Sequence, residues 1–198
     1  MGLAFRYSSG QTPLDANEID GLLIDSIATQ GELDEFEQQN IEQAMQWVLS
    51  HSLKRERILT EEFICQLHKR MYGDVWAWAG GFRTTEKNIG VKSWLIRTEL
   101  RYLLDDARYW VENQIYSPDE IALRFKHRIV SIHCFPNGNG RHSRLIADII
   151  IDKIFKKPVF SWGAADLVAQ GDTRSAYLSA IRSADAGDII PLLRFARS

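Results

Sequence analysis

The residues best suited to chemistry lie between His133 and Arg144, where the chain reads HCFPNGNGRHSR. Gly138 and Gly140 let the backbone adopt positive φ and approach a ligand closely. Successive N–H groups in such a turn can form an anion-binding nest. The helix expected to begin near Arg141 adds free N–H donors and the positive end of its dipole. This stretch therefore predicts a polyphosphate held at a helix N-terminus.

The side chains of the same stretch suit nucleotide chemistry. Arg141 and Arg144 are three residues apart, so they share a helical face and can both bind phosphate oxygens of one ligand. Asn139 can shape the turn by bonding to the neighbouring backbone. His133 precedes the turn, and an imidazole with an ordinary pKa of about 6.5 suits a general base near neutral pH. A hydroxyl that attacks a bound triphosphate needs such a base together with charge neutralisation.

The stretch resembles the signature of Fic-domain proteins, His-x-Phe-x-Asp/Glu-Gly-Asn-Gly-Arg-x-x-Arg, and every fixed position matches except Asn137. Three further segments are similar to Fic cores: WAWAGGFR at 76–83, NIGV at 88–91 and ADAGD at 184–188. More narrowly, the chain resembles the Fic subgroup named "mobile mystery protein B". That likeness rests on TPLD at 12–15, ELDEFEQQNI at 32–41 and PNGNGRH at 136–142.

The resemblance implies an all-α Fic fold, a single helical-bundle domain with a small β-hairpin flap. It implies an enzyme that moves AMP from ATP to a protein Ser, Thr or Tyr hydroxyl. His133 would be the base, and the Gly138-Asn139-Gly140 backbone would hold the α- and β-phosphates. Arg141 would contact the β-phosphate and Arg144 the γ-phosphate.

The resemblance also implies a flap over residues 84–94, which would pair with an extended target peptide by strand addition. The target-docking residues would be Ile89, Gly90, Val91 and Lys92. The target would be a protein with a hydroxyl side chain. Many Fic enzymes modify themselves, so this chain is also a candidate target.

Asn137 departs from the pattern, because the family places there an acidic residue that binds Mg²⁺ between the phosphates. An amide oxygen is a weaker ligand for Mg²⁺ or Mn²⁺ than a carboxylate. The departure leaves open slow transfer, a changed nucleotide or binding pose, or no catalysis. The alternative function is a weakly active or inactive nucleotide-binding or partner-binding module of a mobile-element or toxin–antitoxin-like pair, working beside a helix-turn-helix partner protein. A Fic-type phosphotransferase is a third option.

Residues 1–50 read as an N-terminal arm and helices packed on the core, and residues 51–198 as the Fic core. The arm is a candidate inhibitory region, since Fic inhibitory helices carry Ser/Thr-x-x-x-Glu-Gly/Asn, whose Glu pairs with the second motif arginine. The nearest match is 26–31, with Gln30 in place of Glu. Glu32, Glu35 and Glu37 could substitute geometrically, but we favour a solvated helix face.

Apolar spacing predicts helices over about 32–50, from Thr60 to Met71 and from Leu95 to Tyr116. Ser117 should cap the next helix, with Pro118 at its first position, and that helix should end at the motif. Residues 145–154 are apolar nearly all round, as in a central core helix. Only 80–95 reads as extended chain or a hairpin. His142 is expected on a helix surface and His68 in a structural role.

The chain has 198 residues, 45% apolar residues and 25% charged residues, which predicts one globular domain with a substantial core. A net charge of −2 with dispersed basic residues argues against direct nucleic-acid binding. No apolar run reaches the roughly 18 residues of a membrane span. The N-terminus lacks a secretory apolar region, and two cysteines give no disulfide framework. These features predict a cytoplasmic protein.

Overall fold

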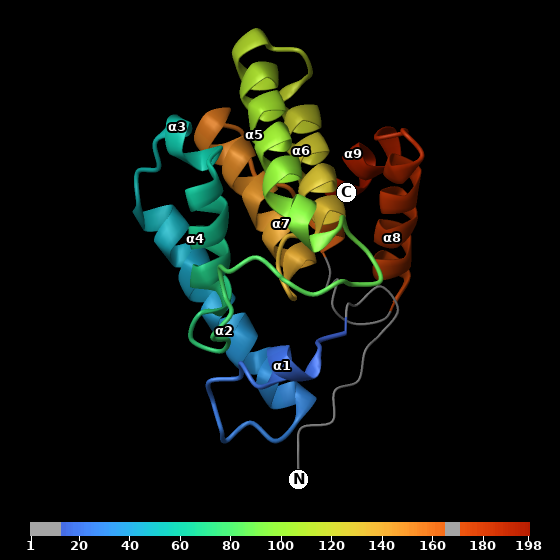
Figure 1. Ribbon diagram of the computed structural model, residues 1–198. Coiled ribbons are helices and arrows are strands. Elements are labelled where there is room, and N and C mark those ends of the chain that lie inside the picture. Colours follow the sequence, from blue (N-terminus) through green and yellow to red (C-terminus); the bar gives the residue numbers. More distant parts are fainter. Residues whose placement is uncertain (1–12, 165–170) are drawn as a thin grey trace.

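The computed structural model describes residues 13–164 and 171–198, and these are almost entirely helical (Figure 1). The α-helices are α1 (Ala16–Ile19), α2 (Gln30–Ser50), α3 (Arg55–Ile58), α4 (Glu61–Tyr72), α5 (Ile96–Asn113), α6 (Pro118–Ile132), α7 (Asn139–Ile149), α8 (Asp172–Asp185) and α9 (Ile190–Ala196). Shorter turns are η1 (Ser93–Leu95), η2 (Ile150–Ile154), which continues α7 as a π-helix, and η3 (Trp162–Ala164). The predicted all-α class is confirmed. Residues 1–12 of the expected arm lie outside the described residues.

Local capping explains where the helices that frame the motif begin. Thr60 caps α4 by accepting a hydrogen bond from the Phe63 N–H at 3.2 Å. Ser117 caps α6 by accepting from the Glu120 N–H at 3.3 Å, and Pro118 occupies the first helical position. The Ser117 cap and the beginning of a helix at Thr60 are as predicted, and α6 ends immediately before His133.

Helices α5, α6 and α7 form the middle of the molecule, with α2 and α4 on one side and α8 and α9 on the other (Figure 1). Helix α6 packs on both α5 and α7, and α2 packs along α4. Apolar side chains from α2 and from the later helices share one hydrophobic core. At its centre Phe125 of α6, Phe135 of the motif and Ile146 of α7 are fully buried. This core fixes the ends of α6 and α7, between which the motif lies.

The segment over residues 84–94 differs from the predicted hairpin. None of its residues is in a strand, and the isolated bridge between Leu22 and Trp76 lies outside it. Its backbone bonds instead to the end of α6, where the Val91 N–H donates to the Ile132 carbonyl at 3.2 Å. The segment, called the flap below, is therefore an irregular excursion that lies against the motif.

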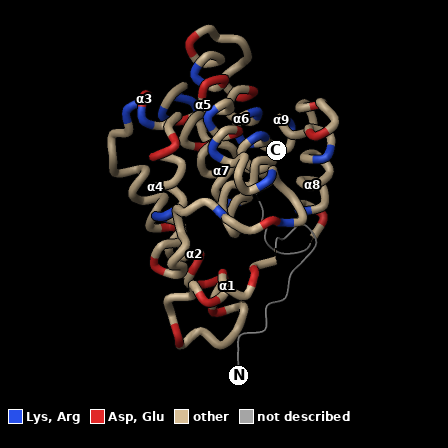
Figure 2. Tube along the Cα trace, in the orientation of Figure 1, with Lys and Arg blue, Asp and Glu red and all other residues tan. Residues whose placement is uncertain are grey.

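Charge is unevenly distributed along the chain. Residues 13–53 contain no Lys or Arg, and Figure 2 shows acidic positions along α1 and α2. Basic residues begin again at Lys54 and recur throughout the later helices. Within residues 13–164 and 171–198, no helix is long and apolar enough to cross a membrane. The acidic N-terminal elements thus lie against a core that supplies basic partners.

Candidate functional site

His133 stands at the C-terminal end of α6 in a left-handed conformation, with φ 59° and ψ 62°. This conformation is uncommon for a residue other than glycine and persists only where the surrounding structure enforces it. The side chain is 4% exposed, and neither ring nitrogen has a hydrogen-bond partner among the described residues. The backbone thus holds the imidazole in place, and both ring nitrogens are buried without a hydrogen-bond partner among the described residues.

The surroundings of His133 keep it neutral. Burial lowers the pKa of His133 from 6.5 to about 4, and the positive charges of Arg83 and Lys87 act in the same direction. A neutral imidazole is the form that accepts a proton from a hydroxyl. A negative charge placed nearby would raise the pKa of His133 again.

The turn after His133 is closed by Asn139, the first residue of α7. Its side-chain oxygen accepts from the Phe135 N–H at 3.0 Å, and its amide donates to the Phe135 carbonyl at 2.8 Å. Gly138 has φ 76°, and a Cβ there would lie 2.5 Å from the Tyr72 ring. Gly140 has nothing within 4 Å of such a Cβ. The turn thus needs glycine at 138, while 140 faces open space at the beginning of α7.

The two motif arginines differ in their partners. Arg141 donates to the Glu37 carboxylate at 2.6 Å, and its guanidinium lies 5.1 Å from the centre of the Tyr72 ring. The other Glu37 oxygen accepts from the Trp76 indole N–H at 2.6 Å. The Arg144 guanidinium lies 5.6 Å from the centre of the Tyr177 ring, and no carboxylate of the described residues pairs with it. Arg144 is therefore the motif arginine that has no carboxylate partner among the described residues.

Glu37 corrects the prediction of a solvated face on α2. Its side chain is buried, with a residue exposure of 6%. Glu32 instead caps α2 through the Ala28 and Thr29 N–H groups, and Glu35 is exposed. Gln30 donates to Asp34 of its own helix, and no hydrogen bond joins it to Arg144 in the described residues. The acidic contact to the motif thus comes from Glu37 and reaches the first arginine.

The side-chain oxygen of Asn137 already accepts a hydrogen bond from the protein backbone. Its side-chain oxygen accepts from the Gly138 N–H at 2.6 Å, and its backbone carbonyl lies 3.0 Å from the His68 Nε2. The described residues also contain no group of three or more His, Cys, Asp or Glu side chains that could hold a metal ion. The residues present therefore do not fit a metal held by the protein.

His68 and His142 are buried and link the motif to neighbouring segments by hydrogen bonds. The Gly80 N–H can only donate, so the His68 Nδ1 at 3.0 Å accepts and its Nε2–H donates to the Asn137 carbonyl. The His68 ring stacks on Phe135 with centroids 3.7 Å apart. His142 is 1% exposed and bonds the Ile64 carbonyl at 3.1 Å, so its predicted place on a helix surface is wrong. The apolar periodicity of α4 could have indicated His68, which lies one turn after the buried Ile64.

The flap lies directly against His133. A Cβ at Gly90, where φ is 100°, would be 2.6 Å from the His133 Cβ. Arg83 is 2% exposed and links the flap to His133. Its guanidinium donates to the carbonyls of His133 at 2.6 Å, Thr85 at 2.8 Å and Val91. The structure thus brings Gly90 and Val91 to His133. The other two predicted docking residues are exposed beside them: Ile89 and Lys92.

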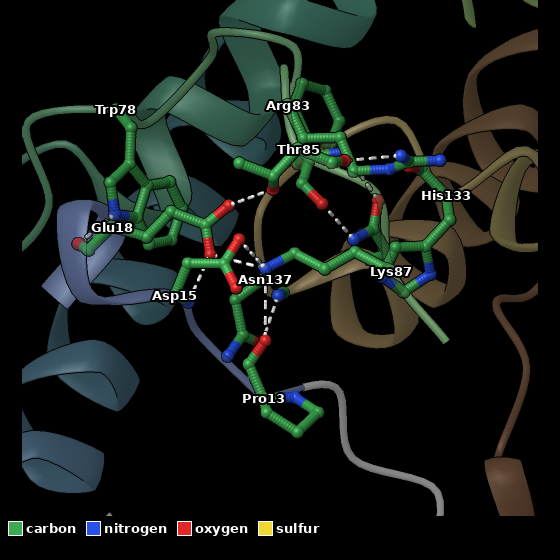
Figure 3. A network of polar contacts seen from close by, with 12 residues as sticks. Pro13, Asp15, Glu18, Trp78, Arg83, Thr85, Lys87, His133 and Asn137 are labelled. Atoms are coloured by element: carbon green, nitrogen blue, oxygen red, sulfur yellow. Dashed lines mark hydrogen bonds and ion pairs between the residues drawn. The ribbon is translucent and has the colours of Figure 1, made fainter. Parts of the chain in front are cut away.

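A polar network joins the flap to the N-terminal segment (Figure 3). Lys87, whose side chain is 3% exposed, donates to Glu18 at 2.5 Å, to Asp15 at 3.2 Å and to the Pro13 carbonyl at 3.1 Å. The Thr85 hydroxyl donates to the other Glu18 oxygen at 2.8 Å. Sequence patterns did not reveal this network, because its partners lie far apart in the chain.

Residues 58–151 match the family model described as the Fic/DOC family. The protein adenylyltransferase Fic of Aedes aegypti is 26% identical over 159 residues, which cover 78% of this chain. The protein of the same name from Drosophila grimshawi is 29% identical over 156 residues, which cover 77% of this chain. This chain spans only 30% of the length of each of these relatives.

Solved structures agree on the fold. Fic-1 of C. elegans (residues 134–508) superposes with a TM-score of 0.68 at 23% identity, covering 90% of this chain and 51% of that one. A Fic-domain signalling protein from Bacteroides thetaiotaomicron superposes with a TM-score of 0.67 at 20% identity, covering 92% and 75%. The family model covers the end of α3, the flap, the motif and α7. Residues 58–151 of this chain therefore match the Fic/DOC family model, and the solved structures show that the chain has the fold of Fic proteins.

Proposed function

We propose that this protein is a Fic-type nucleotidyltransferase that moves AMP from ATP to a Ser, Thr or Tyr hydroxyl of a protein. The observation that carries the proposal is His133, whose neutral and unpartnered ring lies between the flap and the N-terminus of α7. The relatives named protein adenylyltransferase Fic support the same reaction. The flap residues Ile89 to Lys92 would dock the target.

In this proposal the anion site lies at the N-terminus of α7. The N–H groups of Asn139 and Gly140 would bind the α- and β-phosphates, joined by that of Gly138 once it leaves the Asn137 oxygen, and Arg144 would bind the γ-phosphate. Arg141 would turn toward the β-phosphate, sharing or leaving its contact with Glu37. The adjacent helix dipole and two arginines would stabilise the negative charge of the leaving pyrophosphate.

The proposed step is an in-line displacement at the α-phosphorus. The target hydroxyl oxygen forms a bond to the α-phosphorus while His133 takes the hydroxyl proton. The bond from the α-phosphorus to the bridging oxygen of the β-phosphate breaks, and pyrophosphate leaves with that electron pair. The products are an AMP ester of the target and pyrophosphate.

ATP is the proposed substrate, and Mg²⁺ or Mn²⁺ would enter only with its phosphates. Asn137 would be a weak neutral ligand for that ion, since its oxygen already accepts from Gly138. No step of the proposed reaction therefore depends on a metal held by the protein.

Two observations favour a second function, a weakly active or inactive module that binds nucleotide or a partner. Asn137 replaces the acidic residue of the resembled signature, and Glu37 occupies Arg141. Under this alternative the chain belongs to a mobile-element or toxin–antitoxin-like pair with a helix-turn-helix partner. The resemblance to the "mobile mystery protein B" subgroup is the sequence support for it.

Intact-mass spectrometry of the purified protein after incubation with ATP and Mg²⁺ or Mn²⁺ tests the proposal, with His133→Ala as the control. We expect a mass gain equal to AMP that His133→Ala abolishes while ATP binding is nearly unchanged. A gain that persists in His133→Ala removes this residue from the role of base. A gain equal to phosphate indicates phosphotransfer, and no gain favours the binding module.

A further inference from the structure

The N-terminal segment over residues 13–23, called the strap, lies alongside residues 75–87. Its far end is held by backbone bonds: the Leu23 N–H donates to the Val75 carbonyl at 2.9 Å, and the Ala77 N–H to the Gly21 carbonyl at 2.8 Å. Its near end is held by Glu18, whose carbonyl accepts from the Trp78 indole at 2.9 Å. The strap is thus anchored next to the first half of the flap.

Arg83 contacts both halves of the flap, and each half has a further partner of its own. Arg83 and the backbone pair between Val91 and Ile132 hold its second half to α6. The first half is held by Arg83 at the Thr85 carbonyl and by Glu18, through the Thr85 hydroxyl and the Lys87 ammonium. Between them, the N–H groups of 86–90 donate to no other group within the described residues. This unpaired edge is what an added peptide strand requires.

Lys87 is an unusual residue to bury. Lysine is almost never inside a protein unless it is paired, and its ammonium carries three N–H donors. Here the three acceptors are Glu18, Asp15 and the Pro13 carbonyl, all from the strap. Buried ion pairs contribute little net stability, and their best attested role is to fix one arrangement among several. If either Lys87 or its acidic partner is replaced by a neutral residue, the remaining buried charge is destabilised, and the segment must shift to bring that charge into contact with water.

We propose that Glu18 is a positioning residue, which through Lys87 and Thr85 holds the flap beside His133 in the shape that receives an acceptor peptide. The inference rests on the proposed function, because it assigns the unpaired flap edge to target docking. Figure 3 shows Glu18 and Lys87 directed toward each other between the strap and His133. The strap thus belongs to the docking site, although it lies outside the matched family domain.

Hydrogen–deuterium exchange of the whole protein tests the structural half of the inference. In Glu18→Gln we expect residues 84–94 to exchange about tenfold faster, with residues 139–149 unchanged. Asp20→Asn is the matched control, because Asp20 is exposed on the same segment and its side chain has no contact to the flap. Unchanged exchange of the flap in Glu18→Gln overturns the proposal.

The functional half is tested by the rate at which the protein modifies itself with ATP. We expect Glu18→Gln to slow transfer about tenfold while the Kd for ATP stays within about twofold, since docking and not nucleotide binding is impaired. Lys87→Met should reproduce the loss, and Lys87→Arg, which keeps the ion pair, should restore the rate. Faster flap exchange with an unchanged transfer rate overturns the positioning role.

The two proposals fail in different ways. A wild-type protein that transfers nothing contradicts the proposed function alone. The exchange measurement needs no nucleotide, so it still decides whether Glu18 holds the flap. Thermal unfolding of each variant shows whether the fold is retained, and Lys87→Arg keeps the test decisive if Lys87→Met unfolds.

Discussion

The Asn137 side chain makes a bond that a carboxylate could also make. Its oxygen accepts from the Gly138 N–H, one of the donors of the expected anion nest. A carboxylate at the same position would keep this bond and add a negative charge next to the phosphates. The difference between Asn and Asp is therefore one of charge, which makes the position suitable for a clean test.

Asn137→Asp should weaken ATP binding in the absence of metal and tighten ATP binding in the presence of Mg²⁺. Without metal, the new carboxylate repels the phosphates and weakens ATP binding. With Mg²⁺, it becomes a ligand between protein and phosphates and tightens binding about tenfold. Calorimetric titration with ATP, with and without Mg²⁺, measures both. Equal metal dependence in the two proteins would show that position 137 does not face the ion.

Arg144→Ala should weaken the binding of ATP about tenfold more than that of ADP, because in the proposed function Arg144 makes a charge-assisted bond to the γ-phosphate. Arg144 has no carboxylate partner among the described residues, so its removal leaves no charge stranded. Competition binding of ATP and ADP measures the ratio. Arg101→Ala, at an exposed position on α5, is the control. Equal losses for both nucleotides would contradict the assignment of Arg144.

At the scale of the element, α2 contacts the motif although the family match begins only at residue 58, after this helix. Glu37 joins Arg141 of α7 to the Trp76 indole, three groups from separate parts of the chain. A phosphate that binds Arg141 must compete with this carboxylate. In the proposed function, helix α2 would thus lower the affinity of the motif for a phosphate, although it contributes no residue to the motif.

Glu37→Gln should tighten the binding of ADP and ATP several-fold, because the amide still accepts from Trp76 but no longer neutralises Arg141. Isothermal titration gives both affinities. Glu35→Gln, on the exposed face of the same helix, should leave them unchanged. Weaker nucleotide binding in Glu37→Gln would mean that the pair orients Arg141 for the phosphate and does not compete with it.

The parts of the structure that could be predicted depend on neighbours in sequence. The caps at Thr60 and Ser117 and the end of α6 before His133 follow from residues within one helical turn. The parts that could not be predicted depend on distant partners. Glu37 and Arg141 are 104 residues apart, and Glu18 and Lys87 are 69 apart. No spacing rule brings such residues together.

The predictions for the flap and for His142 were wrong for the same reason. The pattern of β-branched and glycine residues over 80–95 suggested a hairpin, but the Val91 N–H and the Arg83 side chain bond to the end of α6 and within the flap. His142 has polar neighbours in sequence, yet α4 covers its face of α7 through the Ile64 carbonyl. In both cases tertiary contacts overrode the local pattern.

At the scale of the whole molecule, three buried histidines lie around the motif in their neutral form. Burial is the largest cause in each, and it lowers the pKa of His133 and His142 to about 4 and that of His68 well below its usual value. Each imidazole would have to bind a proton inside the protein without a carboxylate partner. The fold therefore depends on these side chains remaining uncharged.

The free energy of unfolding should fall as the pH drops from 6.5 toward 4. In that range the unfolded chain binds protons at these histidines and the folded chain does not, so acid favours unfolding. Between pH 7.5 and 5 each histidine with a pKa of about 4 should contribute a loss of about 2 kcal/mol. Urea unfolding across this range measures the slope.

His142→Gln isolates one of these contributions, because its amide can keep the bond to Ile64 but does not titrate. The loss of stability between pH 7.5 and 5 should shrink by about 2 kcal/mol. A His142→Gln protein with the wild-type slope would show that His142 is not held neutral by the fold.

The long-range pairs at the site also bear on the order in which the chain folds. Glu18 and Glu37 leave the ribosome first, but their partners Lys87 and Arg141 follow 69 and 104 residues later. Contacts between residues so far apart in sequence form late in folding, after the helices, because closing the long loop between the two residues costs conformational entropy. A nascent or truncated chain that lacks α7 has neither the nest nor its arginines. Competence for the proposed nucleotide chemistry would therefore arise only as folding is completed.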